Sequence, residues 1–449
     1  MKNVLVLGAG MVARPLVRYL LERGFRLVQA DIDPARAEAM IDDHPNGRAV
    51  PLDMSDAAAL AALVQEADLT VSLVPPQFHP VAARACVAAG KPMVTASYVS
   101  DAMQELDAAA RDKGVLLLNE IGVDPGIDHM SAMRLIDMVR GREGRVLLFQ
   151  SYCGGLPAPE AVNNPLGYKF SWAPRGVLTA ARNDAQYLRH HVHVHVPWRR
   201  LFRDMHMVGC GGVADFEAYP NRDSLAYREI YGLQHVATMY RGTLRYPGWC
   251  DCLHNFVRLG LLDLRPRYLG RTTCAGYLRH LLGVSGGNHL PEAVARRLGV
   301  ARDSLPVWAL EWLGLTSDDP VEASPLAPLD FLSQRMQAKL AYRPGERDMI
   351  VLKHELIAEY PDRSRELLTS RMVEFGYPDG DTAMARTVSL PVAIAARLIL
   401  EGKIERTGVA RPITPDIYLP VLAELEELGI VCQEEIETME PGLGREGDV

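Results

Sequence analysis

The sequence predicts an α/β protein with a Rossmann-type doubly wound parallel sheet, followed by a mixed α/β domain with a helical insertion. Three observations favour this fold class. Short apolar stretches alternate with helical stretches through the first 120 residues, a glycine-rich turn joins the first strand to the first helix, and alternating strand patterns after residue 120 enclose a long helical stretch.

The first strand is predicted over residues 4–7, and the turn that follows it is Gly8-Ala9-Gly10-Met11-Val12-Ala13. This is the Gly-x-Gly-x-x-Gly/Ala pattern of dinucleotide-binding proteins. Its first glycine permits a tight turn, its second lets the backbone approach a pyrophosphate, and a small third residue allows the helix to pack closely on the strand. The phosphates are expected at the helix N-terminus, where free N–H groups favour an anion.

The second strand, residues 26–30, ends in Asp31, 21 positions beyond Gly10. An acidic side chain at this strand end is placed to bind a ribose 2′-hydroxyl and to repel a 2′-phosphate, which favours NAD over NADP. Two alternatives remain open. Asp31 can be a solvated loop residue before a helix capped at Asp33, or the turn can belong to a methyltransferase.

The alternation continues along the chain. Strands separated by helices of this length pair in parallel with right-handed crossovers. Helices are predicted at 34–41, 55–65, 79–89 and 100–113, and strands at 49–52, 69–74, 92–95 and 115–118.

Doubly wound sheets bind ligands outside the carboxyl ends of their strands. Asp53 is expected near an adenine edge, and Val74 and Ser97 nearer a nicotinamide. Each can also be an ordinary residue at the end of a strand, without a ligand. The residues at this edge are Gly8 to Val12, Asp31, Asp53-Met54, Val74-Pro75, Ser97-Tyr98 and Asn119-Glu120.

The second half begins with an alternating strand at 145–152 and contains long loops of unusual composition, which in compact domains are often functional. Their predicted positions are 151–159, 164–172, 219–224 and 241–246. A helical lid is predicted at 259–341, a returning strand at 347–354 and a frayed tail beyond residue 440. The predicted domains are 1–120, with helices of 385–440 packing back on it, then 121–258 with 342–384 as the substrate domain, and the lid.

Composition narrows the class of protein. The 449 residues carry a formal net charge of −8 and no strongly basic segment, which argues against a nucleic-acid partner. Seven scattered cysteines do not form a disulfide framework, and no leader or 18-residue apolar run is seen, so a cytoplasmic protein without a membrane partner is expected.

One stretch suggests a metal. In the sequence from His190 to Val196, the side chains of His191, His193 and His195 share one strand face, and a His-x-His pair can bind zinc. No nearby cysteine or carboxylate completes such a site. An exposed strand is predicted here, and no metal is expected.

The sequence closely resembles the saccharopine dehydrogenase (L-glutamate-forming) family, also called saccharopine reductases. The resemblance extends over essentially the whole chain. It is carried by the Gly8 turn, Thr95 to Tyr98, the Asp124-Pro125-Gly126 turn, Ser151 to Pro159, Asn164 to Trp172, Tyr219 to Ser224, Arg241 to Tyr246 and Arg347 to Leu352.

The resemblance implies a nicotinamide-dependent oxidoreductase that interconverts saccharopine with L-glutamate and 2-aminoadipate 6-semialdehyde, in lysine metabolism, as a homodimer. It implies cofactor contacts from Gly8, Ala9, Gly10, Met11, Val12, Asp31, Asp53, Met54, Val74, Ser97, Val123, Asp124, Pro125 and Ser171. It implies substrate contacts from Ser97, Tyr98, Asp124, Cys153, Arg222, Thr243, Leu244 and Arg245. Family members that use NADPH carry an arginine in place of Asp31, so their coenzyme is not transferred to this chain.

Saccharopine carries three carboxylates, and the planar guanidinium of arginine suits such groups; Arg222 and Arg245 are the predicted carboxylate ligands. Loss of hydride gives an imine that water hydrolyses, which requires proton transfers. Asp124 is expected to anchor a substrate ammonium or act as acid/base, and Tyr98 to donate a proton. Cys153, His129 and Lys169 are the other titratable residues of the matching segments.

Two alternatives remain. One is a carboxynorspermidine dehydrogenase, which couples an aldehyde with an amine on a more cationic substrate. The other is a non-catalytic NAD-binding sensor, in which the substrate-binding residues are expected to be lost.

Overall fold

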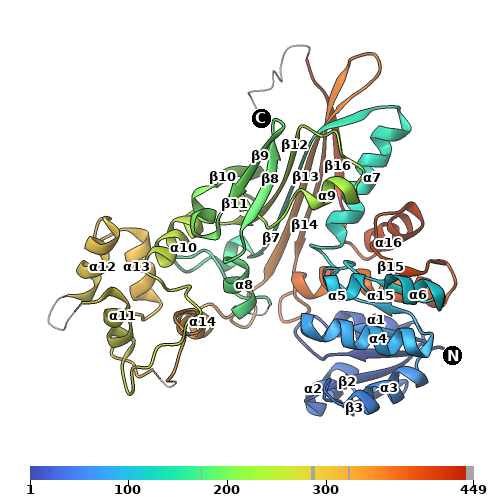
Figure 1. Cartoon of the computed structure of the whole chain (residues 1–449), viewed down its shortest axis with the longest axis horizontal. Coiled ribbons are helices and arrows are strands. Elements are labelled where there is room, and N and C mark those ends of the chain that lie inside the picture. The colour runs from blue at the N-terminus through green and yellow to red at the C-terminus, as the bar shows by residue number, and fades with distance from the viewer. Residues whose placement is uncertain (173, 285–288, 322–323, 441–449) are drawn as a thin grey trace. The chain divides into compact units, whose positions relative to one another are not determined.

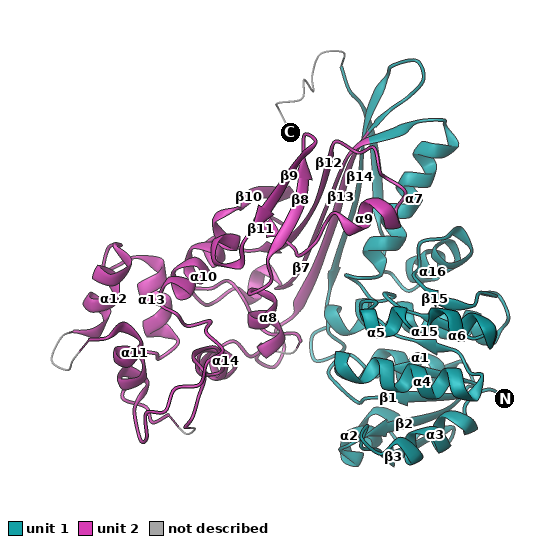
Figure 2. Cartoon of the chain, in the orientation of Figure 1, with its two compact units in different colours: residues 1–146, 358–441 teal, residues 147–357, 442–449 magenta. Residues whose placement is uncertain are grey.

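The computed structural model describes residues 1–172, 174–284, 289–321 and 324–440 (Figure 1). The predicted frayed tail lies outside these residues. The chain divides into two compact units, shown in different colours in Figure 2. Among the described residues, unit 1 comprises 1–146 and 358–440, and unit 2 lies within 147–357. The predicted three-domain division stays a prediction.

Unit 1 contains a seven-stranded sheet in which every pair of neighbouring strands is parallel. The strand order is β15-β6-β5-β4-β1-β2-β3. The strands are β1 (Asn3–Leu7), β2 (Arg26–Asp31), β3 (Gly47–Pro51), β4 (Leu69–Ser72), β5 (Met93–Val94), β6 (Leu116–Leu118) and β15 (Gly408–Ala410). This is the Rossmann order with one added edge strand, so the predicted doubly wound sheet is confirmed.

Helices cover both faces of this sheet. Leu5 and Leu7 of β1 share a core with α3 (Ala57–Glu66), α4 (His79–Ala89), α5 (Asp101–Gln104) and α6 (Asp107–Asp112). Alternate strand residues face opposite sides, and α1 (Arg14–Glu22) packs with α15 (Ala383–Leu400) on the other face. The helix α2 (Pro34–Ile41) packs against β2 and β3, and the short helix η1 (Pro76–Phe78) precedes α4.

The longest helix of the described residues, α15, begins after Thr382, whose side chain accepts a hydrogen bond from the Ala385 amide at 3.0 Å. By length and composition it is apolar enough to cross a membrane, with a mean hydropathy of 1.5, but 78% of it is buried inside the structure. Its contacts with α1, β4 and β5 are those of a core helix of unit 1.

Unit 1 also contains an antiparallel strand pair, β14 (Arg365–Phe375) with β16 (Gln433–Thr438). The helix α7 (Ile127–Gly141) contacts β14 and packs with α16 (Pro415–Glu427). Arg134 of α7 connects these parts, because its guanidinium donates to Glu434, Glu426 and the carbonyl of Cys432.

Unit 2 is built on a mixed sheet in the order β10-β11-β12-β7-β13, with β8 pairing with both β12 and β9. The pair β7–β12 is parallel, and the pairs β10–β11 and β11–β12 are antiparallel. The strands are β7 (Arg145–Pro157), β8 (Ala185–Arg189), β9 (Val192–Val196), β10 (His206–Cys210), β11 (Ala214–Pro220), β12 (Thr238–Arg245) and β13 (Asp348–Glu359). The chain passes from one unit to the other inside β7 and again inside β13.

Helices fill the sequence between β12 and β13, as predicted for the helical insertion. They are α10 (Trp249–Arg258), α11 (Cys274–Leu282), α12 (Leu290–Leu298), α13 (Leu305–Trp312) and α14 (Pro328–Lys339). Shorter helices of unit 2 are η2 (Pro159–Ala161), α8 (Pro174–Ala180), η3 (Trp198–Arg203) and α9 (Ala226–Ile230).

Two predicted loops are strands instead. Residues 151–157 continue β7, and residues 241–245 belong to β12, where Cys153 pairs with Thr243. The glycines of these segments suggested loops, because glycine is rare in strand interiors. Gly154 is needed here, since an added Cβ would lie 2.8 Å from the Leu244 side chain and carbonyl oxygen.

Candidate active site

The glycine-rich turn of unit 1 has the geometry of a phosphate site. Gly8 has φ +99°, and an added Cβ would lie 3.0 Å from the carbonyl oxygen of Leu73. At Gly10 an added Cβ would meet no described atom within 4 Å, so the backbone faces open space. Ala13 is fully buried, as expected for the small third residue.

The N-terminus of α1, just after this turn, is open to an anion. Its first flanking residue is Ala13, and among the described residues no side chain caps the helix and no acidic residue occupies its first turn. Unpaired amide N–H groups at such a position bind phosphate oxygens. The turn and this helix end therefore fit the pyrophosphate of a dinucleotide cofactor.

Asp31 supports the turn from the end of β2. Its carboxylate accepts hydrogen bonds from the amide of Ala9 at 2.6 Å and from the amide of Asp33 at 2.9 Å. The side chain of Gln29 donates to the carbonyl of Gly8 at 2.9 Å. Asp31 is thus engaged with the protein backbone, and its position at a strand end does not by itself decide the coenzyme.

The other predicted cofactor residues of unit 1 follow the carboxyl ends of neighbouring strands. Asp53 is exposed after β3, and its carboxylate accepts from the Ser55 amide at 2.8 Å, which lowers its pKa. Met54 and Val74 are half-buried, whereas Val123 and Pro125 are buried in the turn after β6. Parallel strands bring these ends to one edge of the sheet.

Ser97, predicted to contact both cofactor and substrate, is held by a residue that the sequence analysis missed. The imidazole of His79 lies between two hydroxyls, with Nδ1 2.8 Å from Oγ of Ser72 and Nε2 2.7 Å from Oγ of Ser97. Burial lowers the pKa of His79 to about 4. A histidine at a helix start, just after a strand that ends at the ligand edge, was the available signal.

The two predicted catalytic residues lie together. The hydroxyl of Tyr98 donates to Oδ1 of Asp124 at 3.2 Å, and both side chains are half-buried. Asp124 is carried by a tight turn in which Gly122 and Gly126 face each other, with the Gly122 amide donating to the Pro125 carbonyl at 2.8 Å. The turn presents Asp124 beside the segment after β5.

Glu120, predicted at the ligand edge but without an assigned role, fixes the backbone of this segment. Its carboxylate accepts from the amide of Val99 at 2.9 Å and from Nε of Arg411 at 2.8 Å, and lies 2.8 Å from Nε2 of His129. Burial disfavours the charge of Glu120, but the hydrogen bond and charge of His129, together with Arg411 and Val99, outweigh it and lower its pKa to about 2. Thus Glu120 and His129 serve to hold the loop of Tyr98.

In unit 2 the predicted substrate residues lie on paired strands. Thr243 of β12 lies between Cys153 of β7 and Tyr219 of β11, and both Cys153 and Thr243 are half-buried. Leu244 is fully buried. Arg222, in the segment after β11, is exposed with a φ of +52°.

Ser171, the predicted cofactor residue of unit 2, is buried with a relative exposure of 2%. Its hydroxyl has no hydrogen-bond partner among the described residues. Lys169, two residues earlier, forms a buried ion pair with Glu346. The lysine is therefore occupied as a structural cation, and the site offers no reason to assign it a covalent role.

Arg245 is an unusual buried cation. Its side chain is 5% exposed, and its guanidinium lies over the rings of Tyr168 and Trp249, at 4.8 and 5.3 Å from their centroids. It donates to the carbonyl of Leu244 at 2.7 Å, but among the described residues its Nε has no partner, and no carboxylate is among the groups that act on its charge. Its cross-strand neighbour Glu217 instead accepts from the amides of Gly248 and Cys250 at the start of α10.

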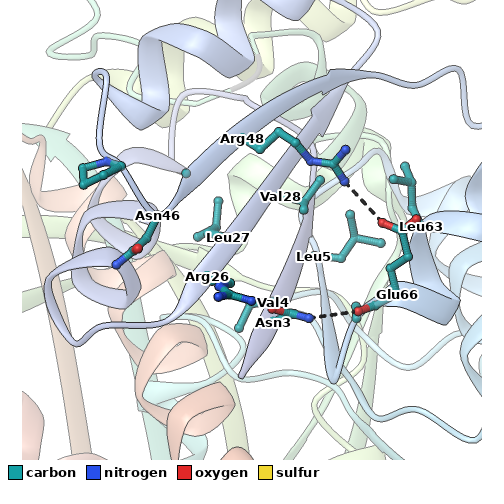
Figure 3. A pocket seen from close by; sticks show the side chains of 13 residues that line it. Asn3, Val4, Leu5, Arg26, Leu27, Val28, Asn46, Arg48, Leu63 and Glu66 are labelled. Carbon is teal, nitrogen blue, oxygen red and sulfur yellow. Dashed lines mark hydrogen bonds and ion pairs between the residues drawn. The ribbon is translucent and has the colours of Figure 1, made fainter. Parts of the chain in front are cut away.

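A cavity of about 300 Å³ lies at the opposite edge of the unit 1 sheet, at the beginnings of β1, β2 and β3 (Figure 3). Its floor is formed by apolar side chains such as Leu5, Leu27 and Leu63, and Arg48 points toward Glu66 across its mouth at 3.3 Å. Because ligands of doubly wound sheets bind at the carboxyl ends of the strands, this cavity is not the cofactor site.

The histidine-rich segment, residues 190–196, consists of β9 and the two residues that precede it. His193 lies 3.1 Å from Oε1 of Gln186, and His195 lies 3.5 Å from a carboxylate oxygen of Asp184. Within the described ranges there is no group of three or more histidine, cysteine or acidic side chains that could hold a metal ion.

The sheet and the turn are those of a Rossmann-type dinucleotide-binding protein, and comparisons with known proteins refine this class. The family model "Saccharopine dehydrogenase NADP binding domain" matches residues 4–118, and "Saccharopine dehydrogenase C-terminal domain" matches residues 122–430. The chain therefore belongs to the saccharopine dehydrogenase family, a family of oxidoreductases.

Relatives and a solved structure agree with this assignment. The saccharopine dehydrogenase [NADP(+), L-glutamate-forming] of Schizosaccharomyces pombe is 37% identical over 448 residues, which cover 97% of this chain and 99% of the relative. The mitochondrial alpha-aminoadipic semialdehyde synthase of Bos taurus is 39% identical over 443 residues, but this chain spans only about half, 47%, of its length. The apo saccharopine dehydrogenase (L-Glu forming) structure from Saccharomyces cerevisiae superposes with a TM-score of 0.89 at 34% identity, covering 97% of this chain and 100% of that one.

The comparisons correct one prediction. NAD was expected from Asp31, but the matching family model is an NADP-binding domain, and the fungal relatives are named as NADP(+) enzymes. The expectation of NAD is therefore wrong. The physical reason lies in the hydrogen bonds of Asp31, whose two carboxylate oxygens accept from the amides of Ala9 and Asp33 and so support the turn.

Proposed function

We propose that this chain catalyses the NADP-dependent interconversion of saccharopine and water with L-glutamate and 2-aminoadipate 6-semialdehyde. The single observation that carries the proposal is Arg245, a buried guanidinium without a carboxylate partner in the described chain. A buried charge left unpaired is costly, so such a residue is expected where a ligand supplies the anion. Saccharopine, with three carboxylates, supplies it.

Cofactor binding is proposed at the residues that follow the strand ends of unit 1 and at Ser171. The open helix end after the glycine-rich turn suits the pyrophosphate, and NADP bound there supplies a hydride acceptor. The proposed contacts are those of Gly8 to Val12, Asp31, Asp53, Met54, Val74, Ser97, Val123, Asp124, Pro125 and Ser171.

Substrate binding is proposed at Arg245 and Arg222, each of which would hold a carboxylate. Aromatic rings around Arg245 exclude water, so a carboxylate bound there meets a charge that is weakly screened. The proposed contacts also include Ser97, Tyr98, Asp124, Cys153, Thr243 and Leu244.

Tyr98 and Asp124 are proposed to act at the substrate nitrogen, where a proton is transferred and a positive charge is bound. Loss of hydride from the carbon beside the bridging nitrogen gives an imine, and attack by water then releases glutamate from the aldehyde. These steps need a proton donor near nitrogen and an anion that orients the amine. The hydroxyl of Tyr98 is the proposed proton donor, and Asp124, which accepts from it, is the proposed ammonium anchor.

The experiment is to follow the absorbance of reduced nicotinamide with purified protein and saccharopine, supplying NADP and NAD in parallel. Turnover with NADP at a higher kcat/KM than with NAD supports the proposal. Turnover of carboxynorspermidine in place of saccharopine would favour the polyamine-type alternative. Cofactor binding without turnover of either substrate would favour the sensor.

A cytoplasmic location and a homodimer remain part of the proposal. The dimer is tested by sedimentation equilibrium of the purified chain, where a mass of about twice 49.5 kDa is expected. A monomer mass across the micromolar range would contradict it.

A further inference from the structure

Ser97 belongs to the ligand edge of unit 1, but what orients its hydroxyl lies behind it. The backbone of Ser97 is fixed at both ends, because its amide donates to Oγ1 of Thr95 at 3.3 Å and its carbonyl accepts from the amide of Glu120 at 3.1 Å. The side-chain torsion alone remains to be set. The imidazole of His79, 2.7 Å from Oγ, is in a position to set it.

The imidazole itself is anchored. His79 is the first residue of α4 and is 4% exposed, and its other ring nitrogen lies 2.8 Å from Oγ of Ser72, the fully buried last residue of β4. Through its two hydrogen bonds, the imidazole ring therefore links the end of β4 and the start of α4 to Ser97 at the ligand edge of the sheet. Burial in this position keeps the ring neutral at neutral pH, so it carries one N–H donor and one acceptor nitrogen.

The direction of the hydrogen bonds follows from Ser72. Within the described chain, the only hydrogen bond of the Ser72 side chain is the one to His79. A buried hydroxyl proton without an acceptor is costly, so Ser72 donates to Nδ1. The proton of the ring is then on Nε2, which donates to Oγ of Ser97.

We propose that His79 is a positioning residue that holds the Ser97 hydroxyl as a hydrogen-bond donor toward a ligand oxygen, with Ser72 fixing the tautomer of the ring. Because the oxygen of Ser97 already accepts from Nε2–H, its proton is directed away from the imidazole. The ligand group it suits is an sp² oxygen, present both in the carboxamide of the cofactor and in the carboxylates of the substrate. This inference rests on the proposed function for the identity of these ligands.

A double-mutant cycle tests the proposal. The His79→Asn variant keeps an amide near Ser72 but is too short to reach Ser97, whereas His79→Gln keeps a donor at the position of Nε2. We expect Ser97→Ala and His79→Asn each to raise a KM or lower kcat roughly tenfold, and the double variant to lose no more than either alone. His79→Gln is expected to recover most of the activity.

The affected parameter identifies the oxygen. A change in the KM of NADP assigns it to the carboxamide, and a change in the KM of saccharopine assigns it to a carboxylate. Ser389→Ala is the matched control, since this fully buried hydroxyl donates to the Ala385 carbonyl within α15 at 2.7 Å and should leave both values unchanged. Additive losses in the cycle, or equal losses for the asparagine and glutamine variants, would overturn the proposal.

A second measurement does not depend on turnover. The ring nitrogens of His79 are assigned by ¹⁵N NMR of histidine-labelled protein, with His79→Gln identifying the signal. The Nε2–H tautomer at neutral pH is expected, and Ser72→Ala should weaken that preference. If the wild-type ring is in the Nδ1–H tautomer, the proposal for His79 is contradicted even if the protein turns over saccharopine. If the wild-type protein is inactive on saccharopine, the proposed function is contradicted, but the tautomer measurement still tests the role of His79.

Discussion

At the scale of single residues, the most informative is Arg245, because its guanidinium is buried and its Nε has no hydrogen-bond partner among the described residues. Tyr168 and Trp249 surround its guanidinium, and Glu217, the neighbouring carboxylate across the strand pair, is already engaged by amides of α10. Aromatic faces stabilise a cation only in part. We expect the remaining stabilisation to come from an anion that binds.

Replacing Arg245 by Met keeps the length and apolar stem of the side chain and removes the charge. We expect the KM of saccharopine to rise roughly 10- to 100-fold, because a hydrogen bond to a charged partner contributes about 1.5–3 kcal/mol. The KM of NADP should change little. Arg335→Met, which removes a guanidinium that donates to Leu313 and Asp319 in unit 2, is the control expected to leave both values unchanged. Equal effects of the two variants would argue against a carboxylate at Arg245.

Asp31 is expected to act on cofactor affinity through the turn. Asp31→Ala leaves the amides of Ala9 and Asp33 without their carboxylate acceptor, so the affinity for NADPH should fall about tenfold in a fluorescence titration. Asp33→Ala is the matched control. It removes the cap of α2, where Asp33 accepts from Ala35 at 3.1 Å, and should cost about 1 kcal/mol of stability without changing the affinity. Unchanged affinity in Asp31→Ala would contradict the supporting role.

The sequence predicted some residues of the candidate site better than others. Tyr98 and Asp124, singled out as catalytic, do share a hydrogen bond. His79 was missed and Glu120 was placed at the ligand edge without a role, because both act through contacts with Ser97 and His129 that only the folded sheet creates. The role of Asp31 was inferred from its position, whereas its hydrogen-bond partners decide what it does.

At the scale of elements, the turn from Gly122 to Gly126 depends on a backbone that side chains do not allow. Gly126 has a φ of +149°, and an added Cβ would lie 2.0 Å from the carbonyl oxygen of Gly122. The amide of Ile127 donates to the same carbonyl at 2.9 Å, so the turn leads directly into α7. Asp124 stays beside Tyr98 only while the two ends of the turn, Gly122 and Gly126, remain in contact.

Gly126→Ala is therefore expected to lower the free energy of unfolding by more than about 2 kcal/mol and to lower kcat, because steric overlap adds to backbone strain. The comparison is Gly90→Ala, at a φ of +69° with no described atom within 4 Å of the added Cβ, where strain alone should cost about 1 kcal/mol. Both values come from urea unfolding. Similar losses for the two variants would show that the turn can adapt.

The elements themselves were largely predictable in the first 120 residues, since strands buried on both faces form unbroken apolar runs such as Val4 to Leu7. In the second half the same approach failed at β7 and β12. Gly154 and Gly242 interrupt the apolar pattern there. A Cβ added at Gly154 would meet Leu244 of the neighbouring strand, and one added at Gly242 would meet Tyr240 of its own strand and Tyr152 of β7, contacts that the sequence does not display.

At the scale of the whole molecule, acid should destabilise the fold in two steps. The pKa of His79 is about 4 instead of 6.5, so the unfolded chain takes up this proton first and stability falls between pH 6.5 and 4. The pKa of Glu120 is about 2 instead of 4.5, so its contribution is complete above pH 4.5 and is lost as the pH falls toward 2. Each shift corresponds to roughly 3 kcal/mol.

Urea unfolding as a function of pH checks this expectation. The difference between wild type and His79→Gln should change between pH 6.5 and 4, and the difference between wild type and Glu120→Gln between pH 4.5 and 2. A pH-independent difference for either variant would show that the group titrates alike in the folded and unfolded chain.

The two crossings of the chain, inside β7 and inside β13, have a consequence for synthesis on the ribosome. The sheet of unit 1 takes its edge strand β15 and its core helix α15 from residues 383–410, whereas the described residues of unit 2 all lie within 147–357. The nascent Rossmann sheet therefore stays unfinished until residues 383–410 have been translated, long after its glycine-rich turn. Unit 1 begins before unit 2 along the chain but can be completed only after it.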